Sequence, residues 1–99
     1  MKIYRHGDLL IREVKGMPIN LRRSETNILA LGEATGHKHE LIGDCDVFEN
    51  HKNKFFVVNS TALLKHNEHK TIELAKGLYR VIHEREFSPT LRRPLKVID

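Results

Sequence analysis

The chain has almost none of the residues that stabilise small proteins of oxidising compartments. Only one of its 99 residues is cysteine, Cys45, so no disulfide can form within the chain. We therefore expect a cytoplasmic protein. Tryptophan is absent, and four phenylalanines and two tyrosines are the only large aromatic side chains. Because a core built from so few aromatic residues is thin, we also expect a homo-oligomer that buries further apolar surface.

Long hydrophobic runs are absent as well. No stretch approaches the roughly 18 apolar residues that a membrane-spanning helix needs. Residues 1–6 (MKIYRH) become polar too soon for a signal peptide. The sequence therefore predicts no membrane association.

What the chain does contain is charge and histidine. Seventeen Lys and Arg against 13 Asp and Glu give a net charge of +4, and there are seven histidines. The basic residues gather toward the two ends, where they could attract a phosphate-containing ligand or nucleic acid. The slightly acidic middle favours a bound cation. This middle part holds five of the histidines: His37, His39, His51, His66 and His69.

The apolar residues alternate over short distances rather than at the helical period. Short β-branched runs end at Gly, Asn, Asp or Pro, and roughly seven to nine such runs predict a small antiparallel β-barrel or sandwich. We expect an all-β fold, a single β domain over residues 1–99, and at most one short helix, over 61–69. The expected strands are residues 3–5, 9–14, 27–31, 35–42, 46–49, 55–59, 62–66, 72–74, 78–87 and an edge strand at 95–98.

Two histidines stand two residues apart in the stretch Gly36-His37-Lys38-His39. In a strand, His37 and His39 project from the same face, so they can share a divalent metal ion or divide acid and base roles in a proton transfer. Gly36 would allow a ligand or another backbone to approach closely.

The second histidine pair lies in His66-Asn67-Glu68-His69. This spacing suits one face of a helical turn or a tight loop, whereas in a flat strand only one of the two imidazoles could join His37 and His39. Glu68 could be a ligand, a general base or a group that orients an imidazole. We expect His37, His39, His66 and His69 as metal ligands and His37, His39 and Glu68 as catalytic residues.

Two further residues have weaker claims, and two histidines have none. His83 shares a strand face with apolar residues, so it is either a fourth ligand or a hydrogen-bonded core histidine. Cys45 lies between Asp44 and Asp46, which should raise its pKa, and we interpret it as a buried strand residue. We place His6 and His51 in turns without a special role.

The chain resembles a family of short uncharacterised proteins of bacteria and their viruses. The resemblance rests on residues 32–39 (GEATGHKH), 66–69 (HNEH) and 77–81 (GLYRV), which follow the family pattern G-E-x-T-G-H-x-H, H-x-E-H and G-x-Y-x-V. The resemblance singles out His37, His39, His66, Glu68 and His69, and it implies no particular activity. A looser likeness to cupins rests on the H-x-H pair alone. Gly32 is one residue too close to it, and Glu40 comes too early to be the cupin glutamate.

Three functions fit these observations. The first is a metal-binding β domain, with zinc as the favoured ion, which could act as a metal-dependent hydrolase. The second is a metal-independent nuclease or phosphodiesterase acting on RNA or nucleotides, with histidines as acid and base. The third is a non-catalytic viral accessory or structural interaction module whose histidines stabilise the fold or a subunit interface.

Overall fold

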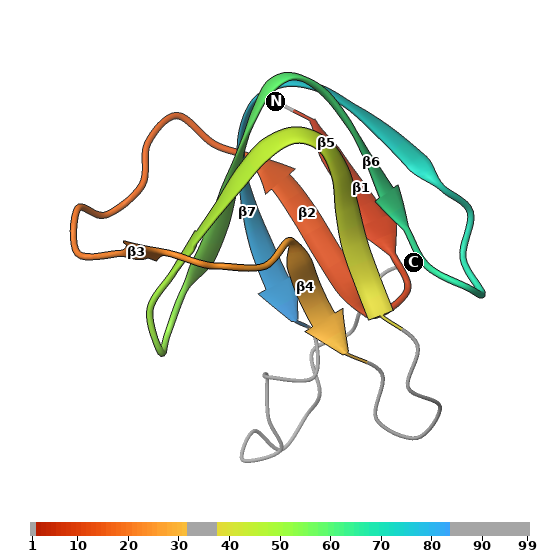
Figure 1. The fold of residues 1–99 in the computed structure, drawn as a ribbon, viewed down its shortest axis with the longest axis horizontal. Helices are drawn as coiled ribbons and strands as arrows, with labels where there is room; N and C mark the ends of the chain where they lie inside the picture. Colours follow the sequence, from red (N-terminus) through yellow and green to blue (C-terminus); the bar gives the residue numbers. More distant parts are fainter. Residues whose placement is uncertain (1, 32–37, 84–99) are drawn as a thin grey trace.

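The structure described is a computed structural model of residues 2–31 and 38–83, and its regular elements are antiparallel strands (Figure 1). The strands are β1 (Ile3–His6), β2 (Leu9–Glu13), β3 (Arg22–Arg23), β4 (Ile28–Leu31), β5 (Lys38–Glu49), β6 (Lys54–Lys65) and β7 (Ile72–His83). They form one sheet in the order β1-β2-β7-β6-β5-β3, and β4 pairs with β5 as well. The all-β antiparallel prediction is confirmed, although the sheet is not closed into a barrel.

The three longest strands bend in the middle. Strands β5, β6 and β7 each have 12 residues, and the pairing shifts register between Gly43 and Cys45 and between Val58 and Thr61. Gly43 has a φ of +134°, which residues with a side chain rarely adopt. The strands therefore arch over together, and the two halves of the sheet enclose the core (Figure 1). The separate strands expected on either side of each irregularity are single bent strands, because a bulge bends a strand without ending it.

The helix considered for residues 61–69 is not formed. Residues 61–65 end β6, and Ala62 and Leu64 are buried whereas Thr61, Leu63 and Lys65 are exposed. This is a period of two, and pairing with β5 and β7 overrides the helix propensity of the segment. No helix that could cross a membrane is present in the residues that the structure describes.

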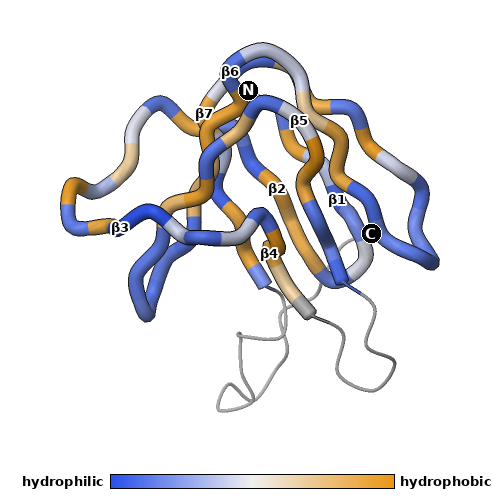
Figure 2. Tube along the Cα trace, viewed as in Figure 1, coloured by the Kyte–Doolittle hydropathy of each residue, from blue (hydrophilic) through white to orange (hydrophobic). Residues whose placement is uncertain are grey.

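The core is aliphatic around one aromatic pair. The rings of Phe56 and Tyr79 stack with centroids 5.1 Å apart, and the Tyr79 hydroxyl donates a hydrogen bond of 2.7 Å to the Ala75 carbonyl. Figure 2 shows hydrophobic residues along β2 and the inner parts of the long strands, and hydrophilic residues in the two hairpin loops after β5 and β6. The loop after β6, the end of β1 and the start of β5 come together on one side of this core.

Candidate functional site

Four imidazole rings meet where the end of β1, the start of β5 and the loop after β6 come together. They belong to His6 at the end of β1, His39 near the start of β5, and His66 and His69 in the loop between β6 and β7. The ring centroids are 4.9 Å apart for His6 and His39, 4.4 Å for His39 and His66, and 4.5 Å for His66 and His69. The remaining three separations lie at 5.6, 5.9 and 6.1 Å. Every ring of this four-histidine group is thus a neighbour of the other three.

The group joins strands that are not neighbours in the sheet. Strands β2, β7 and β6 separate β1 from β5 in the strand order, yet Nδ1 of His6 lies 2.9 Å from Nδ1 of His39. Both side chains are buried, with His6 2% and His39 3% exposed. His66 is half-buried and His69 is exposed, so the group has a closed inner side and an open outer side.

The outer nitrogens of the two buried rings face oxygen atoms. Nε2 of His6 lies 3.1 Å from the carbonyl oxygen of Lys70, and because a carbonyl can only accept, this nitrogen carries the proton. Nε2 of His39 lies 3.5 Å from Oδ1 of Asp8, which favours a proton on that nitrogen too. If both outer nitrogens carry their protons, each ring turns an unprotonated Nδ1 towards the other.

His66 has the same tautomer. The backbone N–H of Glu68 donates a 2.9 Å hydrogen bond to Nδ1 of His66, so in the neutral ring the proton is on Nε2. The HNEH sequence therefore forms a tight loop, as one of the two expected geometries required, and its glutamate contributes a backbone group to the site.

Burial keeps the inner rings neutral. Desolvation, with the neighbouring His66 and His6 as further causes, lowers the pKa of His39 to about 4, against which the Asp8 carboxylate acts only in part. The pKa of His6 is lowered too, first by burial and then by His69. Both rings are consequently uncharged at neutral pH, with one proton each, and this is the state in which imidazole binds a metal ion.

The described residues contain no ready-made ligand shell. Among them, no three His, Cys, Asp or Glu side chains are already arranged as metal ligands. The rings gather, but the direct contact between His6 and His39 shows that their nitrogens do not yet converge on one central point. An ion would have to part these two nitrogens slightly.

The structure brings together three of the expected ligands, His39, His66 and His69. His37 lies outside the described residues. His83 lines a different groove, together with His51. The Glu68 side chain is exposed.

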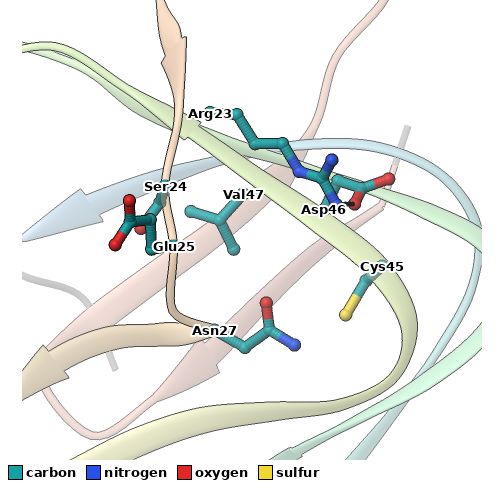
Figure 3. Close-up of a pocket in the computed structure, with 7 residues that line it drawn as sticks. All are labelled: Arg23, Ser24, Glu25, Asn27, Cys45, Asp46 and Val47. Carbon is teal, nitrogen blue, oxygen red and sulfur yellow. Dashed lines mark hydrogen bonds and ion pairs between the residues drawn. The ribbon is translucent and has the colours of Figure 1, made fainter.

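Cys45 is remote from the histidines and lies on β5 beside a shallow groove that Arg23 and Asp46 also line (Figure 3). Burial, then Asp46 and Asp44, raises the pKa of its thiol, as its sequence position indicates. Arg23 forms an ion pair of 2.6 Å with Asp46. The guanidinium of Arg23 is therefore already paired, and Cys45 is a neutral thiol at neutral pH.

His6 is the residue that the sequence interpretation missed. Its expected place in a turn is wrong, because His6 ends β1 and the turn begins only at Gly7. A usable signal existed, since Tyr4 and His6 share one face of the strand and Tyr4 packs against the core. Strand parity alone thus pointed the ring inward.

Comparison with known proteins gives a family but no activity. A family model described as a domain of unknown function matches residues 5–84. No curated protein and no solved structure matches the chain. The match agrees with the expected uncharacterised family, and the cupin likeness stays a prediction.

Proposed function

The chain belongs to this family, DUF8820, and we propose that in this member His6, His39 and His69 bind a transition-metal ion. The observation that carries the proposal is the pair of facing Nδ1 atoms, 2.9 Å apart, on two buried rings whose outer nitrogens both face acceptors. Two lone pairs at this distance repel each other. A cation between them removes the repulsion, and the lowered pKa values of both rings disfavour a proton in that role.

A second tautomer of His39 would also remove the repulsion between the two Nδ1 lone pairs. If Nδ1 of His39 carried the proton, it could donate to His6, but the lone pair on Nε2 would then face the Asp8 carboxylate. A bound metal avoids both conflicts, because it accepts both Nδ1 lone pairs and leaves both Nε2 protons to their oxygen partners. Such outer oxygen partners are typical of metal-binding histidines.

The spacing of the rings fits one shared ion. Imidazole ligands at ~2.0–2.1 Å around a tetrahedral zinc place their nitrogens about 3.3 Å and their ring centroids about 5 Å apart. The six centroid separations run from 4.4 to 6.1 Å. Parting the two Nδ1 atoms by about 0.4 Å would meet the nitrogen requirement. Neutral imidazoles favour zinc, iron, nickel or copper over magnesium or calcium.

His66 has a different part in this proposal. While Glu68 donates to its Nδ1, the proton on Nε2 excludes that nitrogen as a ligand. Three imidazoles would then leave a fourth position for water, and this is the donor set of a catalytic zinc site. The protonated Nε2 of His66 would lie beside that water. His66 would become the fourth ligand only by giving up its hydrogen bond to Glu68.

The metal-independent alternative has less support. A general base works best with a pKa near the working pH, whereas burial lowers the pKa of His39 to about 4. His39 would therefore be a weak base at neutral pH. The interaction-module alternative would use the same His6–His39 contact to join β1 and β5, but it leaves the conflict between the two ring tautomers and the Asp8 carboxylate in place.

Metal content tests the proposal directly. Protein purified without chelator should contain close to one equivalent of zinc or a related ion by elemental analysis. Protein stripped with EDTA should regain one equivalent and melt at a higher temperature with Zn²⁺. Co²⁺ loading should give the visible absorption of a tetrahedral or five-coordinate nitrogen site. A stripped protein that binds no Zn²⁺ and whose melting temperature ignores it would overturn the proposal.

A further inference from the structure

His66 borders a groove as well as the other histidines. The groove has a volume of about 340 Å³ and is lined by Lys38, Glu40, Ile42, Lys65, His66 and Asn67. His66 is thus shared by two sites, since its ring lies 4.4 Å from that of His39 on one side and lines the groove on the other. A molecule in the groove would lie one imidazole away from the proposed metal ion.

The groove lies on the outer face of β5 and β6 because successive residues of a strand point to opposite faces of the sheet. Lys38, Glu40 and Ile42 alternate with the buried His39 and Leu41. Across the strand pair, Lys65 lies opposite Glu40. The same alternation that buries the His39 ring therefore places two lysines on the opposite face, at the end of the strands where His66 follows.

The charges of the groove leave a positive excess. Lys38 lies 3.9 Å from Glu40, a long ion pair between side chains that are 46% and 40% exposed. Lys65 is exposed and makes no ion pair within residues 2–31 and 38–83. Two lysines against one glutamate leave one net positive charge beside the proton-bearing His66.

An apolar wall completes the groove. Ile42 is 46% exposed, and it lines the groove together with Asn67, which follows His66 in the sequence. We infer that this groove binds the phosphate group of a small phosphate ester, with Lys65 and Lys38 holding the anion and Ile42 contacting an apolar part of the same molecule. Binding of the phosphate ester depends on the two lysines. Only a reaction of the bound ester would depend on the proposed metal centre.

Phenyl phosphate is a suitable probe because it combines a dianion with an apolar ring. Titration of the full chain should shift the backbone amide NMR signals of Lys38, Lys65, His66 and Asn67. The Lys38→Gln/Lys65→Gln double variant should bind phenyl phosphate at least 10-fold more weakly, and Lys76→Gln, which removes an exposed lysine elsewhere on β7, should bind as the wild type does. Phenol and benzoate separate the contributions: weaker binding of both shows that the phosphate group is recognised.

The experiment is run on zinc-loaded and on EDTA-stripped protein, so that the two proposals fail separately. Wild-type and double-variant proteins should take up zinc equally, because neither lysine is a proposed ligand. Zinc uptake without phenyl phosphate shifts at the groove would overturn the groove and leave the metal site intact. Groove shifts in a protein that takes up no zinc would overturn the metal site alone. Shifts confined to other basic residues, such as Arg22 and Arg23, would also overturn the groove.

Discussion

Nδ1 of His6 lies 2.9 Å from Nδ1 of His39 although three strands separate β1 from β5 in the sheet. The contact spans 33 residues of sequence and joins the first strand to the middle of the chain. Hydrogen-bond ladders do not connect these two strands, so side chains must do so. The two rings consequently link strands that do not pair, and they are also the pair of side chains on which the proposed metal site depends.

Removing either inner ring should abolish metal binding. We expect His6→Ala and His39→Ala each to lower Zn²⁺ affinity by at least about 100-fold, since each removes one of three proposed ligands. Competition with a chromogenic chelator measures this loss. His51→Ala is the matched control, because His51 is exposed in the hairpin after β5. Wild-type zinc affinity in folded His6→Ala protein would contradict the ligand assignment.

Gly7 should tolerate no side chain. Its φ is +68°, and a Cβ atom there would lie 2.5 Å from Nε2 of His69 and 3.2 Å from Cε1 of His39. We expect Gly7→Ala to lower the free energy of unfolding by about 1–2 kcal/mol from conformation alone and to weaken zinc binding by displacing His69. Gly16→Ala is the control, because a Cβ atom there meets nothing within 4 Å. Urea unfolding and zinc titration of both variants check this, and equal behaviour of the two would refute it.

The sequence was sufficient to predict where the strands lie, but not that neighbouring short strands are continuous as long bent strands. Alternation of apolar residues identified the all-β antiparallel fold, and the parity of residues 62–65 is that of a strand despite their helix propensity. Whether Gly43 ends a strand or bends it depends on the pairing partner, which is not encoded locally. The long bent strands were therefore predicted as pairs of short ones.

The site shows the same division. His39, His66 and His69 could be selected from H-x-H and H-x-E-H spacing, because short motifs reveal residues that lie close in sequence. His6 could not be selected in this way, since its neighbours in space come from residues 39 and 66–70. Only the closing together of β1 and β5 makes it part of the group, and that is a property of the whole sheet.

Asp8 should tune the site through His39. Its carboxylate lies 3.5 Å from Nε2 of His39, where it favours a proton on that nitrogen and, under the metal proposal, would make the facing Nδ1 a better donor to the ion. Asp8→Asn should weaken zinc binding about 10–100-fold without changing the stoichiometry. Asp44→Asn, which changes an exposed carboxylate on β5, should leave affinity unchanged. Equal zinc affinity in the Asp8 and Asp44 variants would remove Asp8 from the site.

The metal-free protein should lose stability as the solution is acidified below pH 6.5. Burial lowers the pKa of His39 from 6.5 to about 4 and lowers that of His6 as well. Between these pH values the unfolded chain binds protons that the folded chain does not, so the free energy of unfolding falls as the pH falls through this window and levels off below it. For His39 alone, the loss is at most roughly 3 kcal/mol.

Urea unfolding of EDTA-stripped protein between pH 7.5 and about pH 4 measures this slope. Carboxyl groups also begin to titrate near pH 4, so the informative quantity is the difference between wild type and His39→Asn, which lacks the titrating ring. The slope between pH 6.5 and about 4 should be shallower in His39→Asn, because only His6 then contributes a proton uptake of this kind. Parallel slopes would mean that His39 is protonated in the folded state. Two neutral rings facing each other could then no longer be the basis of the metal proposal, because a shared proton would already relieve their repulsion.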